Sequence, residues 1–184
     1  MHKQLISVVV LLLALSFAPF VLSKEFKAKV IGIADGDTIK VLKDGVEYKI
    51  RLRGIDCPEK SQPFGNKAKL FTSQLAFNKE VEVIEAGKDR YDRLIADVIL
   101  PDHTSLSEDI VRAGYAWWYR EYAPKDHTLA YAEADAKLEG VGIWSSRIAQ
   151  APWEYRHEQR MNRTKQYEAV KAPQTTVART QEER

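Results

Sequence analysis

Cysteine is nearly absent from this chain of 184 residues, in which Cys57 has no second cysteine to pair with. An internal disulfide is therefore excluded, and the fold has to be stabilised by a packed core. The few histidines, among them His103, His127 and His157, do not form a cluster with metal-ligand spacing. Without a group of cysteine and histidine residues, a zinc site is not expected.

A strong excess of charge of one sign is also missing, because the formal net charge is only +2. The charges are unevenly distributed, since eight basic residues face five acidic ones from Ser145 onward. A basic tail favours contact with a polyanion, although a solvated tail without any partner is the plainer interpretation. Net charge alone does not identify a partner.

The chain has one long apolar run, which extends from Leu5 to Leu22 behind the basic Lys3. This pattern predicts a secretory signal peptide over residues 1–23, cleaved after Ser23, and export to the periplasm or the medium. The alternative is a membrane anchor, but the run is near the lower length limit for a span and contains Pro19. We expect membrane attachment only if the signal stays uncleaved.

Alternating segments follow this run, separated by Asp35-Gly36 and Asp44-Gly45. Asp-Gly pairs between such segments predict tight hairpins, and hence a three-stranded antiparallel meander. A two-residue second turn would place Asp37 opposite Leu52. For Asp56 to reach Asp37, the chain has to bend, and Gly54 is the position where a bend costs least.

The remaining pattern completes a small domain. It predicts a helix after Gly65 and two further strands over 80–84 and 93–100. It also predicts a helix that begins near Ser107 and a helix over His127–Glu139. Together these elements predict the α+β class, with a five-stranded OB-type β-barrel and three α-helices. We expect this domain over residues 24–156, with docking of the segment up to Arg156, and a basic, disordered tail over 157–184.

Charged residues of opposite sign gather at the end of the third strand. Arg51 and Arg53 are followed by Asp56 and Glu59, and arginines bind phosphate while carboxylates bind hard metal ions. This combination predicts half of a site that cleaves phosphodiesters. Each residue also has a plainer reading: Asp37 as a turn residue, the arginines as an exposed strand face, and Asp56 to Glu59 as a polar strand exit.

The order and spacing of several motifs strengthen the prediction. Those motifs are Asp35-Gly36-Asp37-Thr38, the run from Arg51 to Glu59, Tyr91-Asp92-Arg93, the run from Val111 to Ala116, and Gly142-Ile143-Trp144. Together they resemble the staphylococcal nuclease-like (thermonuclease) family. The resemblance implies an OB-type barrel and Ca²⁺-dependent cleavage of DNA and RNA that leaves 3′-phosphate ends.

The resemblance also implies roles for individual residues. Asp37, Asp56 and the Cys57 backbone carbonyl would bind calcium, Glu59 would be the general base, and Arg51 and Arg93 would hold the phosphate. Tyr91 would lie beside the nucleotide, and Asp35 would support the calcium ligands. The chain departs from the family pattern at Cys57, which replaces a threonine, at Asp92, which replaces a glycine, and in a shorter loop over residues 60–64.

These observations predict an exported Ca²⁺-dependent nuclease that acts as a monomer on DNA or RNA and needs no obligate protein partner. The alternative is a non-catalytic OB-fold module that binds nucleic acid. Such a module would need only basic and aromatic surface and could dispense with Asp37 and Glu59.

Overall fold

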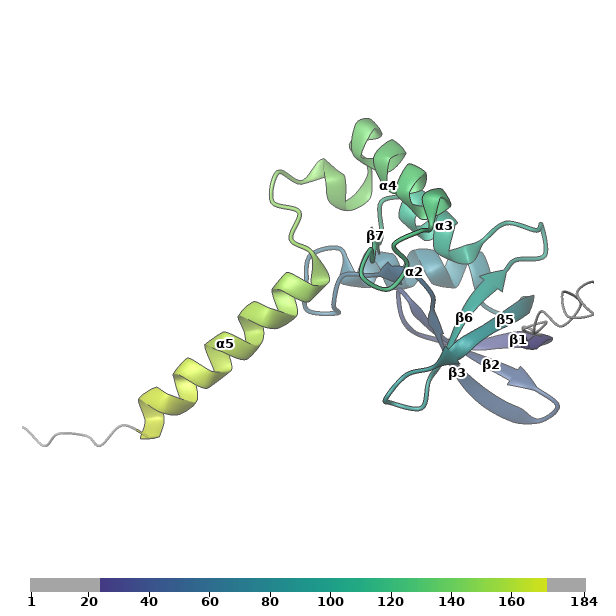
Figure 1. Ribbon diagram of the computed structural model, residues 1–184, viewed down its shortest axis with the longest axis horizontal. Coiled ribbons are helices and arrows are strands. Elements are labelled where there is room, and N and C mark those ends of the chain that lie inside the picture. Colours follow the sequence, from purple (N-terminus) through teal and green to yellow (C-terminus); the bar gives the residue numbers. More distant parts are fainter. Residues whose placement is uncertain (1–23, 172–184) are drawn as a thin grey trace, which may run out of the picture.

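The computed structural model describes residues 24–171, which form a closed five-stranded barrel with helices packed at one end (Figure 1). The strand order is β1-β2-β3-β6-β5, and neighbours are antiparallel except β3 and β6, which are parallel. The strands are β1 (Lys24–Asp35), β2 (Thr38–Lys43), β3 (Val46–Leu52), β5 (Glu80–Lys88) and β6 (Leu94–Ile99). This architecture confirms the predicted α+β class and OB-type barrel.

The second hairpin, between β2 and β3, adopts the predicted register. Lys43 pairs with Val46 across a turn in which Asp44 and Gly45 have φ angles of 49° and 78°. Positive φ at both central residues is the geometry that favours Asp-Gly in such a turn. The Leu52 N–H donates to the Asp37 carbonyl oxygen at 2.9 Å, so the predicted pairing of these two residues is confirmed.

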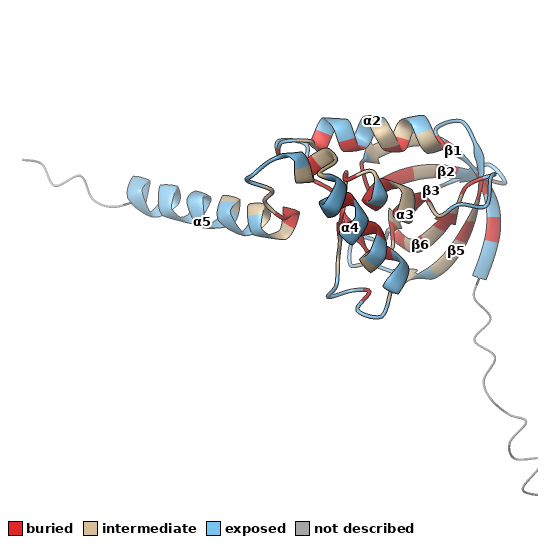
Figure 2. Ribbon diagram, turned by 90° about the horizontal axis from the view of Figure 1, so that it is seen from above, coloured by how far each residue is buried: buried red, intermediate tan, exposed pale blue. Residues whose placement is uncertain are grey.

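The barrel is closed around β-branched and other aliphatic side chains. Val30, Ile39, Val41, Ile50 and Val98 are fully buried, and Figure 2 shows the buried residues along the inner faces of the strands. The end of β3 alternates between buried and more exposed residues, as the two-residue period of a strand predicts, whereas β2 begins with two consecutive buried residues, Thr38 and Ile39. The strand ends that carry charged residues are therefore held by a rigid core.

Three helices lie close to their predicted positions: α2 (Gly65–Ala76), α3 (Leu106–Arg112) and α4 (His127–Glu139). The N-cap of α4 is Asp126, and Gly140 ends that helix with a φ angle of 64°, as predicted. Helix α3 begins at Leu106, close to the predicted start near Ser107, but Ser107 is not its N-cap. Its N-cap is Ser105, whereas the Ser107 hydroxyl is buried and donates to the Arg53 carbonyl oxygen at 3.3 Å.

A short two-stranded sheet connects the barrel to the helices. Strand β4 (Ile55–Asp56) pairs with β7 (Trp117–Trp118), and a 3₁₀ turn, η1 (Gly142–Ser145), follows α4. Trp144 packs edge-on against Trp117 at 5.3 Å between ring centroids. Asp56, on β4, thus lies between the barrel and the helical layer.

A further helix, α5 (Pro152–Lys171), occupies much of the segment predicted to be a disordered tail. For residues 157–171 that prediction is wrong. The segment begins with a proline, which is tolerated in the first turn, and continues with glutamate, glutamine, arginine and lysine, which favour helix. Only its beginning approaches the barrel, and the rest projects outward (Figure 1). The predicted signal over residues 1–23 and the remaining tail over 172–184 lie outside the described residues.

None of the helices within residues 24–171 has the length and apolar character needed to cross a membrane.

Candidate active site

Two buried carboxylates meet where the hairpins approach β4. The side chains of Asp37 and Asp56 are 9% and 2% exposed. The Arg51 Nη2 atom lies 3.3 Å from Asp37 Oδ2 and 2.9 Å from Asp56 Oδ1. Gly54, with a φ angle of 74°, provides the predicted bend between β3 and β4 that brings these carboxylates to one guanidinium.

Backbone atoms fix this arrangement. The Arg51 Nη1 atom donates to the carbonyl oxygens of Leu52 and Ile55 at 3.1 and 2.8 Å. The Cys57 N–H donates to Asp37 Oδ2 at 2.8 Å, which places the backbone of Cys57 beside the carboxylate pair. Its thiol is buried, and burial raises the thiol pKa, so Cys57 is uncharged and unsuited to nucleophilic attack.

The environment of Asp56 disfavours its ionised form. Burial raises the pKa of Asp56 above its ordinary value; the neighbouring charge of Asp37 adds to this rise, and hydrogen bonds and charge from arginines oppose it. For Arg51, burial works against the charged form, but the two carboxylates outweigh this effect and raise its pKa. The cluster therefore requires positive charge to hold both carboxylates ionised.

Glu59 is held at the edge of the cluster by the loop before α2. The Glu59 N–H donates to Gln62 Oε1 at 3.1 Å, and the Gln62 N–H donates to the Glu59 carbonyl oxygen at 2.8 Å. Gly65 packs so closely on this loop that a Cβ atom there would lie 2.0 Å from the Glu59 carbonyl oxygen. The position of the Glu59 backbone thus depends on the absence of a side chain at Gly65.

The hairpin between β5 and β6 brings Arg93 to the other side of the cluster. Arg93 Nε lies 2.6 Å from Asp89 Oδ2, and Arg93 Nη1 lies 3.5 Å from Thr38 Oγ1, next to Asp37. The Tyr91 ring is largely exposed, with the Arg93 guanidinium 5.5 Å from its centroid. Asp92 has a φ angle of 60°. Glycine, which the family pattern has at this position, adopts such a left-handed conformation readily.

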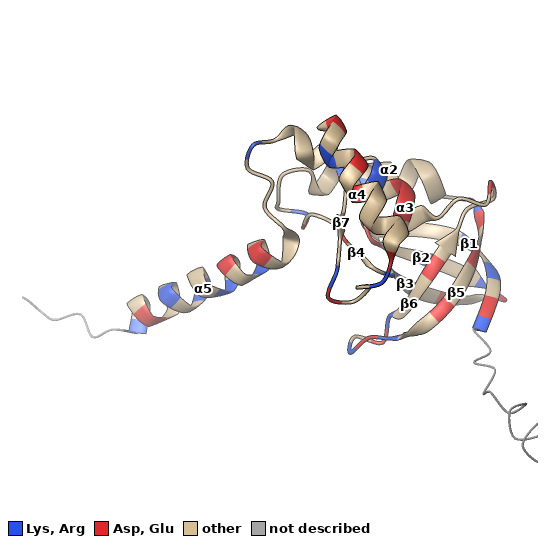
Figure 3. Cartoon of the chain, turned by 45° about the horizontal axis from the view of Figure 1, so that its top comes forward, with Lys and Arg blue, Asp and Glu red and all other residues tan. Residues whose placement is uncertain are grey.

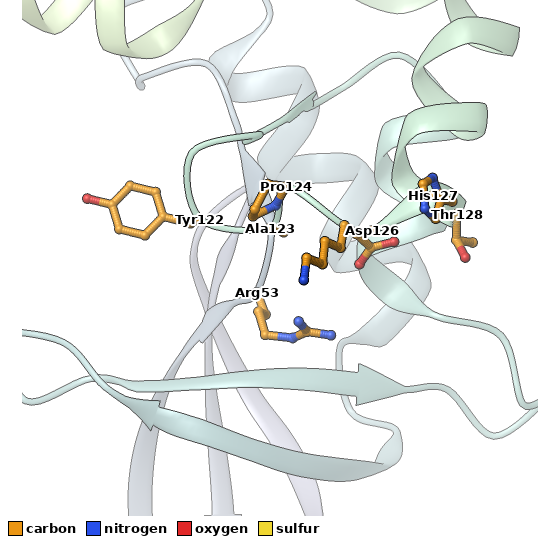
Figure 4. Close-up of a pocket in the computed structure, with 8 residues that line it drawn as sticks. Arg53, Tyr122, Ala123, Pro124, Asp126, His127 and Thr128 are labelled. Atoms are coloured by element: carbon orange, nitrogen blue, oxygen red, sulfur yellow. The ribbon is translucent and has the colours of Figure 1, made fainter.

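Two sequence-predicted residues lie apart from the carboxylates. Asp35 is exposed at the end of β1, and no described contact links its side chain to Asp37 or Asp56. Arg53 pairs with Asp97, with its Nε atom 3.0 and 2.9 Å from the two carboxylate oxygens. Figure 4 shows Arg53 in a pocket of about 500 Å³ formed with the beginning of α4, including Asp126 and His127. Arg53 therefore forms an ion pair with β6 and is not in contact with the carboxylate pair.

One site residue was missed by the assignment from sequence. Arg156, the fifth residue of α5, contacts Asp56 Oδ2 through Nη2 at 2.7 Å. Its Nη1 atom contacts Glu59 Oε1 at 2.8 Å and Asp56 Oδ1 at 3.3 Å. Burial opposes the charge of Arg156, but its hydrogen bonds to Asp56 and Glu59 outweigh this effect and raise its pKa. The sequence signal was a single arginine inside an aromatic segment, which predicted docking but no role.

The donor chemistry fits a hard divalent cation. Asp37 and Asp56 offer carboxylate oxygens, and the Cys57 backbone lies beside them through its N–H bond to Asp37. Oxygen ligands of this kind suit Ca²⁺, which also accepts water molecules. Within residues 24–171 there is no group of three or more His, Cys, Asp or Glu side chains able to hold a metal ion, so backbone and water would have to complete the coordination.

Comparison with known proteins agrees with this geometry. Residues 49–146 match the family model described as staphylococcal nuclease homologue. A protein named micrococcal nuclease from Shigella flexneri is 37% identical over 141 residues, which is 72% of this chain and 81% of that protein.

Two further relatives have similar coverage. An uncharacterised endonuclease from Haemophilus influenzae is 36% identical over 141 residues, 76% of this chain and 78% of its own length. The protein named ParB from Escherichia coli is 35% identical over 143 residues, 73% of this chain and 81% of its own. The matched family region begins after Asp37 and ends before Arg156.

Proposed function

The chain belongs to the staphylococcal nuclease-like family, and from that premise we propose that it is an exported, Ca²⁺-dependent nuclease. Its reaction would be the hydrolysis of phosphodiester bonds of DNA, RNA or both, by attack of water, with 3′-phosphate ends as products. The single observation that carries this proposal is the pair of buried carboxylates, Asp37 and Asp56, joined by Arg51 beside the loop of Glu59.

Asp37, Asp56 and the Cys57 carbonyl oxygen are the groups that would hold the calcium ion. A bound divalent cation supplies positive charge for the phosphate oxygens and lowers the pKa of water. Asp37 already accepts hydrogen bonds from Thr38 and from the Cys57 N–H, which orient its carboxylate. Such fixed orientation is what a preorganised site requires.

Arg51, on β3, and Arg93, in the hairpin between β5 and β6, would bind the phosphodiester. Arg51 is anchored on backbone carbonyls, so its guanidinium is fixed, and Arg93 is steered by Asp89 toward Thr38. Planar guanidinium groups match the oxygens of a phosphate and stabilise the negative charge that develops on them. Tyr91, exposed beside Arg93, is suited to contact a nucleotide.

Glu59 is the residue proposed to accept a proton from the attacking water. Its side chain is 40% exposed, in contrast to that of Asp56, so it is accessible to water and substrate. Its backbone is held by Gln62 and Gly65. A general base has to lie within hydrogen-bond reach of the water it activates, and a fixed loop serves that need.

Export and oligomeric state complete the proposal. The pattern of residues 1–23 supports a cleaved signal, and export would bring the enzyme to the periplasm or the medium. We propose that the mature protein acts as a monomer on nucleic acid without an obligate protein partner.

The proposal is tested with protein lacking residues 1–23, incubated with DNA or RNA in Ca²⁺ or in EGTA. We expect cleavage only with Ca²⁺, and a loss of about 10²–10³-fold in rate for Glu59→Gln and for Arg93→Ala. Glu139→Gln, at the exposed end of α4, is the matched control for loss of a carboxylate charge. Products should be extended by a polymerase only after phosphatase treatment.

Cleavage that is unchanged in EGTA would overturn the calcium dependence. Binding of nucleic acid without any cleavage would instead favour the non-catalytic OB-fold module.

A further inference from the structure

We propose that Arg156 is a positioning residue of this site that competes with the divalent cation for Asp56 and Glu59. This inference rests on the proposed metal-dependent function and goes beyond it, because it assigns a role to α5, which lies outside the matched family region. In the cation-free protein, Arg156 holds the two carboxylates; when a cation binds, the guanidinium gives up Asp56.

The contacts of Arg156 support competition. Its two Nη atoms approach both oxygens of Asp56, at 3.3 Å for Oδ1 and 2.7 Å for Oδ2. Asp56 Oδ1 also accepts from Arg51 Nη2 at 2.9 Å, so both oxygens of this carboxylate already have cationic partners. A cation that binds Asp56 must therefore enter next to a guanidinium or replace it.

The charges of the cluster also favour competition between Arg156 and a divalent cation. Three carboxylates, Asp37, Asp56 and Glu59, face two guanidinium groups, Arg51 and Arg156, which leaves one net negative charge. Without Arg156 the balance is two negative charges, which matches a divalent cation. Because Asp56 is buried, charges at this distance are less screened than at the surface, and repulsion between Arg156 and a cation is substantial.

Of the two arginines on Asp56, Arg156 is the one able to leave. Its side chain is 34% exposed, against 16% for Arg51, and within residues 24–171 no backbone carbonyl accepts a hydrogen bond from it. Arg156 lies near the beginning of α5, where the Trp153 ring stacks on the Tyr119 ring with 5.1 Å between centroids and an interplanar angle of 9°. The beginning of α5 is also held by two hydrogen bonds: Tyr155 Oη lies 3.1 Å from Ser61 Oγ, and Gln62 Nε2 donates to the Gln150 carbonyl oxygen at 2.6 Å.

Gln62 links the two sides of this arrangement. It accepts from the Glu59 N–H and donates to Gln150, the residue just before Ala151 and α5. The first turn of α5 and the loop of Glu59 are therefore one connected unit. Since coupling between ligands is reciprocal, a turn that lowers cation affinity is itself loosened when a cation binds.

The test is isothermal titration of the purified chain with CaCl₂ in the absence of nucleic acid. We expect Arg156→Gln to bind Ca²⁺ about tenfold more tightly than the unmodified protein, in the range typical of coupled sites. Arg160→Gln, an exposed arginine one turn further along α5, removes the same charge without touching the carboxylates and should leave the affinity unchanged. Thermal melting of each variant checks that it is folded.

A second readout follows the guanidinium itself by ¹⁵N NMR, with the Arg156 Nε–H signal assigned by its loss in Arg156→Gln. Saturating Ca²⁺ should shift this signal and speed its exchange with water, because the ion pair to Asp56 is broken. Equal or weaker Ca²⁺ binding by folded Arg156→Gln would overturn the inference, as would an Arg156 signal that Ca²⁺ does not change. If neither protein bound Ca²⁺, the proposed calcium dependence would itself fail, a result that is distinguishable from equal affinities.

Discussion

Asp56 has two arginine partners, which reach it from two very different regions of the molecule. Arg51 comes from β3 inside the barrel wall, is 16% exposed and also donates to two backbone carbonyls. Arg156 is the fifth residue of α5, is 34% exposed and lies 100 residues from Asp56 in the sequence. Asp56 thus forms one ion pair with an arginine of the barrel and another with an arginine of a docked helix.

This difference teaches where the site is rigid and where it can change. The barrel partner is held by strand register and backbone hydrogen bonds, so it cannot move without unfolding part of the sheet. The helix partner is held where Trp153 packs on Tyr119 and on a small hydrophobic cluster, and by a few polar contacts, while the rest of α5 projects into solvent (Figure 2). Figure 3 shows both acidic and basic residues along that projecting part, as expected of a solvated helix.

The largest effect is expected from Arg51→Ala. Removal of this guanidinium leaves Asp37 and Asp56 buried without their shared partner, which typically costs about 3–5 kcal/mol of stability. Arg156→Gln removes a charge from the same carboxylate at a more exposed position and should cost about 1 kcal/mol or less. Urea unfolding of both variants in EDTA measures the contrast. Equal losses of stability would show that the two arginines are not anchored differently.

Gly65→Ala tests the loop that connects the two regions. An added Cβ atom would collide with the Glu59 carbonyl oxygen at 2.0 Å, so the loop has to shift. We expect a loss of about 1–3 kcal/mol of stability and, because a displacement near 1 Å can cost about 10²-fold in rate, a large loss of activity. Gly32→Ala is the control, since its Cβ atom would meet only the flexible Lys40 side chain at 3.4 Å. A Gly65→Ala enzyme with unchanged activity would mean that Glu59 tolerates movement of its loop.

Trp153→Ala weakens the helix region while leaving the barrel intact. The lost stack on Tyr119 is worth about 0.5–1.5 kcal/mol beyond the buried area. Hydrogen exchange followed by mass spectrometry should show faster exchange in the first turns of α5 and unchanged protection in the barrel strands. Tyr167→Ala, at an exposed position further along α5, should change neither. Loss of protection throughout the barrel would indicate that α5 is part of the core.

The smallest expected effect concerns how the free energy of unfolding depends on pH in the acid range. Because burial and Asp37 raise the pKa of Asp56, the folded state binds this proton more tightly than the unfolded state. Asp56 therefore contributes stability that is full below its unfolded pKa, near 3.9, and is lost as the pH rises through the folded pKa. In Arg156→Gln this stability should be retained to a higher pH before it is lost. The substitution removes a hydrogen bond that lowers the Asp56 pKa, so the folded-state pKa rises.

Carboxyl ¹³C NMR titration in EDTA measures this pKa in both proteins. A lower Asp56 pKa in Arg156→Gln than in the unmodified chain would contradict the assigned contact.

The barrel half of the site was predictable from sequence because it depends on local rules. Two-residue turns fix the hairpin register, which places Asp37 beside Leu52, and Gly54 marks the bend that brings Asp56 to the cluster. The general placement of Arg93 followed from its motif. Its steering by Asp89, four residues earlier, needed the turn geometry of the hairpin.

The remaining contacts join residues that no local rule connects. Arg53 pairs with Asp97 across 44 residues, and Arg156 reaches Glu59 across 97 residues. The tail was predicted to be disordered because its composition is polar, but helix propensity, with docking of its first turn, determined the outcome. Long-range docking of this kind depends on tertiary packing, which the pattern of a single segment does not contain.

The parallel pairing of β3 with β6 has a consequence for the order of folding. It sets Arg51 opposite Ile95, close to Arg93, after the chain has passed through β4, α2 and β5. Such a non-local pairing forms late, because the entropy of closing the intervening loop is lost before the contact is made. A refolding chain should therefore bury its hairpin core first and gain catalytic competence only in the step that closes the barrel. Recovered activity would then lag behind recovered fluorescence, and newly made chains would stay inactive until β6 is in place.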